Sequence, residues 1–167
     1  MRRVIIKPVR VTAAAKKELE QIDFADCFAF HNREDELEKI CATVFAKPKG
    51  WVGALFKIRE FLGALVGLKV EMDEKKETTE ELDLGFFNVY HKEEKEIIIG
   101  ADDKHLNFRA VLIKTDDPRH NIELVTLVKF HNRFGRIYMS LIKPFHVIVV
   151  RAMAKRASKP FLNVEVA

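Results

Sequence analysis

Three polar side chains within apolar stretches could carry acid–base chemistry: Asp26, Tyr138 and His146. A histidine on a mostly apolar helix can protrude into a cavity and titrate near neutral pH. Tyr138 lies eight residues before His146, on nearly the same side of an ideal helix, so the two could mark the ends of one cavity. The alternative is a buried histidine satisfied by hydrogen bonds, and the sequence leaves both interpretations open.

Other candidates would bind a ligand without reacting with it. Arg109, which shares a strand phase with His105, is an anion-binding candidate, as are Arg133 and Arg136 at the start of a predicted helix. The alternative for each arginine is an exposed surface charge. The candidates for lining an apolar cavity are aromatic or amphipathic, and their alternative is ordinary core packing. These candidates are Trp51, Phe56, Phe108, Tyr138, Phe145 and His146.

No residue pattern identifies a reaction, a metal or a cofactor. The sequence has no glycine-rich phosphate loop and no recognisable serine–histidine–aspartate arrangement. Cys27 and Cys41 lie 14 positions apart, with no CxxC motif and no histidine at a zinc-ligand spacing. We therefore predict no metal site and no cofactor. We expect two buried free thiols in a cytoplasmic protein, although a disulfide is allowed in principle.

The composition is that of a globular protein, because 48% of the 167 residues are hydrophobic and 32% are charged. This length predicts a single domain, residues 1–167, with its core at about 20–157 and flanking segments at 1–19 and 158–167. The longest apolar run, 137–150, is shorter than the roughly 20 residues that cross a bilayer. No transmembrane segment and no signal peptide are therefore predicted.

Charge is distributed unevenly along the chain. Segments 1–17 and 133–159 contain basic side chains and no acidic ones, whereas 71–83 is mainly acidic. Basic clusters can bind nucleic acid or anionic lipid. Because the net charge is only +4, we expect no nucleic-acid partner.

Hydrophobic periodicity divides the chain into the elements that must position these residues. An early strand and two helices precede a charged loop, and four strands with short connections then predict an antiparallel meander. A long basic helix ends the pattern. The expected elements are strand 23–31, helices 33–46 and 51–68, loop 71–83, strands 84–91, 95–101, 105–114 and 120–131, and helix 133–157.

One face of the meander is apolar and needs a cover, and we expect the opposite face to be solvated. Phe108 and Phe130 belong to the apolar face, where Thr126 is the one polar member of its strand. The last helix supplies the cover, and Pro144 should kink it near Ser140. This order predicts an α+β helix-grip fold of the START and Bet v type, with an antiparallel sheet wrapped around a long C-terminal helix. The predicted inward stripe of that helix is Phe134, Ile137, Leu141, Phe145, Ile148 and Ala152, broadened by Val149 and Met153.

The tetrapeptide FHNR occurs twice, at 30–33 and at 130–133. In both copies a predicted strand ends in Phe-His and a predicted helix begins at Arg. Asparagine is among the best N-caps, because its side-chain oxygen accepts a hydrogen bond from a free backbone N–H of the first turn. We therefore predict that Asn32 and Asn132 cap helices and that the repeat is not a duplicated catalytic motif.

Two segments carry a resemblance to a known family: ADDKHLNFR at 101–109 and VKFHNRFGRIYMSLIKPFHVIVVRAM at 128–153. They are similar to a bacterial family catalogued as domain of unknown function 2867, and the resemblance covers about 20–157. It implies a place in the helix-grip, polyketide-cyclase and lipid-transfer-like superfamily. It implies no established activity.

Three hypotheses of function follow. The first is a small apolar-ligand-binding domain with a cavity between the sheet and the C-terminal helix. The second is a cyclase- or hydrolase-like enzyme that uses Asp26, Tyr138 or His146 in that cavity. The third is a protein- or membrane-surface interaction module, which requires an exposed apolar patch. A homodimer is compatible with all three.

Overall fold

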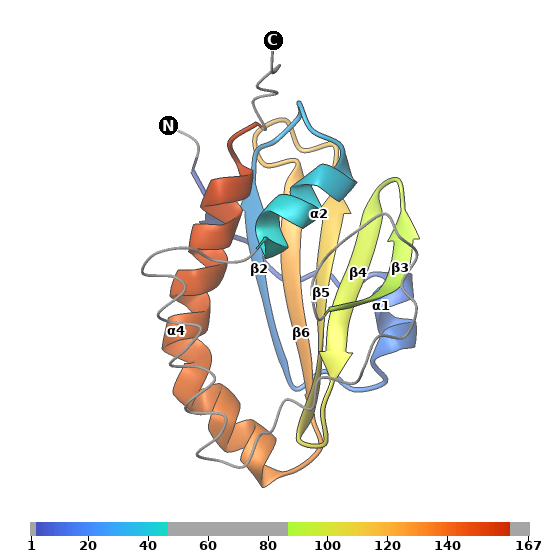
Figure 1. Cartoon of the computed structure of the whole chain (residues 1–167), viewed down its shortest axis with the longest axis vertical. Helices are drawn as coiled ribbons and strands as arrows, with labels where there is room; N and C mark the ends of the chain where they lie inside the picture. Colours follow the sequence, from blue (N-terminus) through green and yellow to red (C-terminus); the bar gives the residue numbers. More distant parts are fainter. Residues whose placement is uncertain (1–2, 47–86, 161–167) are drawn as a thin grey trace.

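The computed structural model describes residues 3–46 and 87–160 (Figure 1). The expected helix 51–68 and loop 71–83 lie outside the described residues, as do the cavity candidates Trp51 and Phe56. The described part is an α+β protein in a helix-grip-like arrangement, with an open antiparallel sheet and a long C-terminal helix.

The described strands are β1 Ile5–Ile6, β2 Phe24–Phe30, β3 Asn88–Glu93, β4 Glu96–Asp102, β5 Leu106–Lys114 and β6 Ile122–Phe130. They form one sheet in the order β1-β2-β6-β5-β4-β3, and every neighbouring pair is antiparallel. The predicted meander is confirmed, because β3 to β6 pair in chain order. The early strand β2 joins this meander beside β6.

The described helices are α1 Ala13–Glu18, α2 Leu37–Phe45 and α4 Arg133–Ala157. α4 has the predicted bounds, and Asn132 caps it, since its Oδ1 accepts a hydrogen bond from Gly135 N at 3.1 Å. α2 begins later than predicted. Asn32 closes a turn before α2 by accepting from Glu34 N and Asp35 N, so the prediction that Asn32 caps a helix is wrong.

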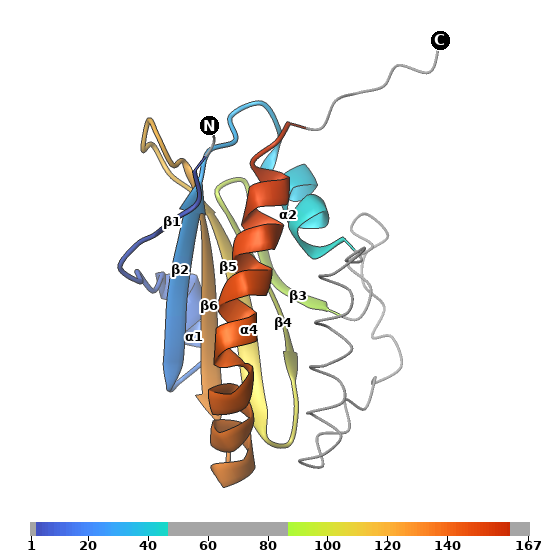
Figure 2. The ribbon, with the colours of Figure 1, turned by 90° about the vertical axis from the view of Figure 1, so that its left-hand side faces the viewer.

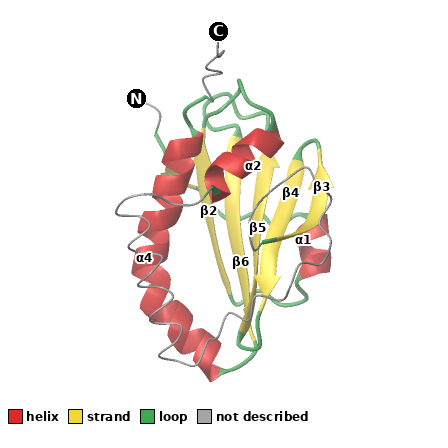
Figure 3. Ribbon diagram, in the orientation of Figure 1, coloured by secondary structure: helices red, strands yellow, loops and turns green. Residues whose placement is uncertain are grey.

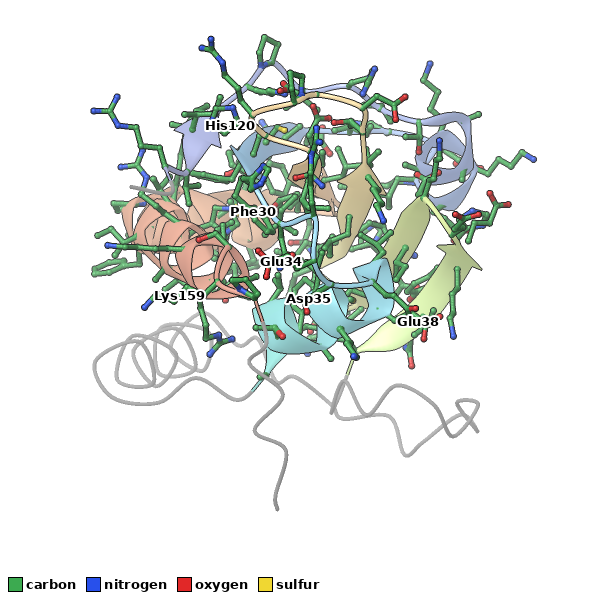
Figure 4. The ribbon with its side chains drawn as sticks, turned by 90° about the horizontal axis from the view of Figure 1, so that it is seen from above. Phe30, Glu34, Asp35, Glu38, His120 and Lys159 are labelled. Carbon is green, nitrogen blue, oxygen red and sulfur yellow. The ribbon has the colours of Figure 1, made fainter. Side chains whose placement is uncertain are left out.

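Asn32 instead ties three segments together at one end of the molecule. Its backbone N–H donates to Asn121 Oδ1 at 3.0 Å, and Asn121 Nδ2 donates back to the Asn32 carbonyl at 2.8 Å. The Asn32 side chain also donates to the carbonyl of Ala157, in the last turn of α4. Figure 4 views this end from above, with Glu34 and Asp35 between α4 and α2.

Arg156 makes a second link between α4 and α2. Its Nη2 donates to the carbonyl oxygens of Val44 at 2.8 Å and Ala46 at 3.1 Å. These carbonyls lie at the C-terminal end of α2, where helical carbonyls lack partners within the helix. A basic residue from the sequence's C-terminal cluster therefore has a structural role, and burial lowers the pKa of Arg156.

β1 and α1 lie in segment 1–19, which we expected only to flank the domain. Thr12 caps α1 by accepting from Ala15 N, and its hydroxyl donates to Glu96 at the start of β4. Seen from the side in Figure 2, α1 and α2 lie on opposite faces of the sheet. The outer face, expected to be solvated, is therefore covered, and that prediction is wrong. Its buried core contains Ala15, Leu19, Cys27, Ile98, Val111, Ile113, Val125 and Leu127.

The larger core lies on the inner face of the sheet, under α2 and the C-terminal half of α4. Figure 3 shows α2 crossing this face and α4 running along its β2 side. The alternation predicted for the meander correctly assigns the apolar residues of this inner face, because every second residue of a strand points to the same face. The buried strand residues of this core are Phe28, Phe30, Ile97, Ile99, Ala110, Leu112, Ile122 and Leu124.

α4 packs with a different side from the one predicted. Phe134, Ile137, Leu141 and Ile148 of the predicted inward stripe are 47–53% exposed, and Phe145 and Ala152 are half-buried. Both sides of the helix are apolar, but the buried side has small residues that allow close approach. A Cβ at Gly135 would lie 2.2 Å from the His105 carbonyl oxygen. α4 remains helical through Pro144 and is bowed in Figure 1. The buried residues are Gly135, Tyr138, Met139, Ile142, Val150, Ala154 and Ala157.

Candidate functional site

Two polar residues lie side by side on the inner face of the sheet, between apolar neighbours in their own strands. The strand register pairs Asp26 of β2 with Thr126 of β6, and Thr126 with Ala110 of β5. Directly opposed residues of antiparallel strands share one face and lie close together. α4 adds a third polar residue, because His146 Nε2 lies 2.9 Å from Asp26 Oδ2. We refer to Asp26, Thr126 and His146 as the polar cluster.

The His146–Asp26 pair is largely buried, with 15% and 17% of the two side chains exposed. A carboxylate only accepts hydrogen bonds, so His146 Nε2 is the donor. His146 is thus a buried histidine with a hydrogen-bond partner. The other carboxylate oxygen, Asp26 Oδ1, is buried and has no hydrogen-bond partner among the described residues. The polar cluster therefore contains a buried acceptor that is not used within the described part of the chain.

The inner face differs on the two sides of the polar cluster. Towards α2, Phe28 and Leu112 are fully buried. In the other direction, Phe24, Phe108 and Phe130 are only half-buried, although they lie on the same face. We call these three side chains the aromatic floor. Half of the inner face is therefore sealed, and the other half presents partly accessible aromatic rings.

The N-terminal half of α4 forms a wall beside the aromatic floor. Tyr138, Met139 and Ile142 are buried and pack against Phe24 and Phe130. The ring of Phe24 also meets the His146 ring edge-on, with 5.8 Å between the ring centroids. Phe24 therefore contacts His146 and also packs against the cluster that contains Tyr138. Neither was predicted to contact it.

The remaining cavity candidates among the described residues are Phe108 and Phe145. The Phe108 ring meets the Phe87 ring at 5.8 Å, and Phe87 meets Phe45 of α2 at 5.5 Å, so aromatic contacts connect the floor to α2. Phe145 is half-buried on α4. Thus Phe108, Tyr138 and His146 border one region of the inner face.

Arg109 lies on the outer face of the sheet, away from this region. Its guanidinium is 3.6 Å from the centroid of the Tyr90 ring, and Nη1 donates to Asp102 Oδ1 at 2.8 Å. Gly100 makes room for it, because a Cβ there would lie 2.9 Å from Arg109 Cδ. Burial raises the pKa of Tyr90, which covers the guanidinium. The exposed-charge alternative does not describe Arg109, since its side chain is buried.

Arg133 and Arg136 are exposed in the first turn of α4. They do not combine with Arg109, which lies across the sheet from α4. The three anion-binding candidates therefore do not form one site.

Two open surface hollows lie elsewhere on the molecule, and both are lined mainly by charged residues. Neither lies between the sheet and α4, and neither has the apolar lining typical of small-molecule sites. One, of about 450 Å³, is lined by Lys7, Pro8, Arg10, Thr115, Asp116, Asp117 and Glu123. The other, of about 570 Å³, is lined by Glu36, Leu37, Glu38, Lys92, Glu93, Glu94 and Lys114.

Lys7 forms two ion pairs within the first hollow. Its Nζ lies 2.7 Å from Asp117 Oδ2 and 3.2 Å from Glu123 Oε1. The hydrogen bond from Lys7 holds the pKa of Asp117 below its usual range. These contacts join β1 to the loop before β6 and give this hollow a structural explanation.

Two further features bear on the function classes. In residues 3–46 and 87–160, no group of three or more His, Cys, Asp or Glu side chains could hold a metal ion.

α4 is long and apolar enough to cross a bilayer by length and composition alone, but it packs against β2, β6 and α2. Only 28% of its most apolar window is buried, so α4 retains apolar surface on its outer side.

Sequence reasoning found Asp26 and His146 separately but missed their pairing and did not select Thr126. A signal for both polar positions was present in the alternation of residues along the two strands. Asp26 lies in the same strand phase as Phe24 and Phe28, and Thr126 is the one polar residue in its own inward phase. Without the register of β2 on β6, nothing showed that the two polar positions are neighbours.

Comparison with known proteins gives a family and no activity. A sequence model of the family described as "Protein of unknown function (DUF2867)" matches residues 19–153. None of the curated proteins and none of the solved structures compared with the chain matches it. The predicted helix-grip superfamily is a broader grouping and stays a prediction.

Proposed function

The chain belongs to the DUF2867 family of proteins of unknown function, and from this premise we propose that it binds a small, largely apolar molecule at the aromatic floor. The observation that carries the proposal is the contrast within one sheet face. Phe28 and Leu112 are fully buried, whereas Phe24, Phe108 and Phe130 keep accessible ring surface. Large aromatic side chains dominate the energetics of apolar recognition.

The polar cluster supports a more specific ligand chemistry. Asp26 Oδ1 is a buried acceptor, and leaving such a group unsatisfied costs about 1–3 kcal/mol. A ligand hydroxyl could donate to this oxygen while an apolar chain covers the aromatic floor. A carboxylate head group would instead bring two negative charges together. The ligand class is therefore an apolar molecule with an uncharged donating head group, because Lys143 Nζ lies 5.6 Å from the centroid of the Phe24 ring and would repel a charged amine.

Two measurements test this proposal. Native mass spectrometry of freshly purified protein should reveal a co-purifying mass. Displacement of a fluorescent apolar probe, phenylnaphthylamine, should then rank decanol above decanoate. Asp26→Asn should reduce this discrimination, because an amide lacks the negative charge that disfavours the carboxylate.

Variants of the floor locate the site. Phe24→Ala and Phe108→Ala should weaken probe binding, whereas Phe134→Ala, which removes an exposed ring from the outer side of α4, should not. Thermal unfolding of each variant separates loss of the site from loss of the fold. Equal probe binding by all three folded variants, or a protein that binds neither probe nor any co-purifying mass, would contradict the proposal.

The His146–Asp26 hydrogen bond favours a second candidate function. A carboxylate that accepts from one imidazole nitrogen can orient the ring for general acid–base catalysis. The hydrogen bond joins α4 to β2, and the Phe24 ring packs against His146, so these contacts alone do not identify a reaction. Once a ligand is known, its chemical conversion by wild-type protein and not by His146→Gln would support an enzyme; unchanged ligand in both would favour binding alone.

A further inference from the structure

The outer side of α4 carries four of the five large hydrophobic side chains that are exposed in the described part of the chain. We call Phe134, Ile137, Leu141 and Ile148 the outward stripe. Their spacings of three, four and seven residues place them on one side of the helix. At about 1.5 Å per residue the stripe is roughly 20 Å long. An exposed apolar strip of this kind marks an interaction surface.

The charges around the outward stripe indicate what covers it. α4 contains no acidic residue, and Arg133, Arg151 and Lys155 are exposed. Arg133 lies four residues before Ile137, and Arg151 lies three residues after Ile148, so both border the stripe on the helix surface. The surface is therefore apolar along its centre and positively charged at both ends.

We propose that the outward stripe docks α4 on an anionic membrane surface, with the helix lying in the plane of the lipid headgroups. An exposed helix face with apolar residues bordered by Lys and Arg has the composition of interfacial helices. Each basic residue near an anionic leaflet contributes about 1 kcal/mol. A second copy of this chain fits less well, because two stripes packed on each other would bring Arg133, Arg151 and Lys155 against like charges.

This inference is independent of the proposed ligand site. The outward stripe and the residues that face the aromatic floor are on different sides of α4, since Tyr138, Met139 and Ile142 are buried against the floor and the stripe is exposed. A variant of one surface should leave the other unchanged. Failure of membrane docking therefore says nothing about ligand binding, and the reverse also holds.

Co-sedimentation with lipid vesicles tests the inference on the full chain. Vesicles with equal parts of phosphatidylcholine and phosphatidylglycerol should retain the protein at low salt and release it at high salt. Pure phosphatidylcholine vesicles should retain much less. Leu141→Glu should abolish retention, and Arg151→Glu combined with Lys155→Glu should weaken it by at least about tenfold, the equivalent of about 1.4 kcal/mol.

Matched controls keep the test specific. Ile6→Glu changes a side chain that is 61% exposed on β1, and Lys16→Glu with Lys17→Glu reverses two charges on α1. Both variants should sediment like the wild type, with unchanged Tm. Three results would overturn the inference. The first is equal retention by neutral and anionic vesicles. The second is a fall of several degrees in the Tm of Leu141→Glu, because this would mean that the stripe is covered in the folded protein. The third is a dimer of the wild type that Leu141→Glu converts to a monomer.

Discussion

Asp26 on β2 and His146 on α4, 120 positions apart in the sequence, share a hydrogen bond of 2.9 Å beneath the long helix. Both side chains are largely buried, so the bond joins α4 to the sheet inside an apolar interface. Two candidates for acid–base chemistry are therefore also part of the packing between α4 and the sheet.

A double-mutant cycle on this pair should give a coupling free energy of about 1–3 kcal/mol, because breaking a buried bond leaves a polar group unsatisfied. The variants are Asp26→Ala, His146→Ala and their combination, measured by urea unfolding. Lys92 and Glu38 provide the control: their ion pair is 3.0 Å long but 34% and 47% exposed, and it should contribute less than about 1 kcal/mol. Similar coupling in both cycles would show that burial of the His146–Asp26 pair has no energetic effect.

Gly135→Ala should destabilise the protein by about 1–3 kcal/mol, as overpacking does. In an ordinary helix the same change stabilises by about 0.5–1 kcal/mol, so the sign of the effect is diagnostic. The reason is the close approach to His105, whose carbonyl oxygen would lie 2.2 Å from the new Cβ. Ser140→Ala, at an exposed position of the same helix, is the control and should change the free energy of unfolding little. A stabilised Gly135→Ala variant would mean that α4 is not held against the turn before β5.

The two asparagines of the repeated FHNR should differ in their contribution to stability. Asn132→Ala removes a cap at an exposed helix end and should cost about 1 kcal/mol. Asn32→Ala removes a buried side chain that bonds to Ala157 O and to two backbone N–H groups, and should cost about 2–4 kcal/mol. Chemical denaturation of the two variants measures both values, and equal costs would argue against the buried link.

Stability should fall as the pH rises above about 9. Burial raises the pKa of Cys27 and of Cys41 from 9.0 to about 12, and both thiols are free. The unfolded chain therefore loses these protons first, so the contribution of each thiol is complete below pH 9 and is lost as the pH rises towards 12. Each pH unit in this window costs up to about 1.4 kcal/mol per thiol. Tyr90 acts in the same direction at higher pH, because burial raises its pKa too.

Urea unfolding at several alkaline pH values measures this trend. The double variant Cys27→Ala with Cys41→Ala should show a shallower dependence on pH, although its stability at neutral pH is lower. An unchanged slope would mean that the two thiols are already accessible to solvent in the folded protein.

The bounds of α4 and the pairing of β3 to β6 could be predicted because they depend on local periodicity and short connections. The side of α4 that packs could not. Phe134, Ile137 and Leu141 are more hydrophobic than Gly135 and Ala154, but the smaller residues allow the helix to approach its neighbours. Hydropathy measures the preference for leaving water and contains no information about steric fit.

In the candidate site, too, features with a local signal could be predicted and features that depend on long-range contacts could not. Asp26, Tyr138 and His146 could be selected because polar groups in apolar segments are unusual, whereas their neighbours depend on long-range register. The two elements in segment 1–19 could not be predicted for a related reason. β1 has only two residues and α1 has six, so neither gives a periodic signal, yet α1 covers the outer core.

The last turn of α4 has a consequence for synthesis on the ribosome. Ala157 accepts from Asn32, and Arg156 satisfies carbonyls at the end of α2, so these contacts are completed only by residues translated 110 to 125 positions later. β2 likewise waits for β6, its neighbour in the sheet. The nascent chain must therefore hold β2 without β6 until residues 122–130 leave the exit tunnel, and chains stalled before Arg156, which lack the contacts of α4 with Asn32 and α2, should remain sensitive to protease.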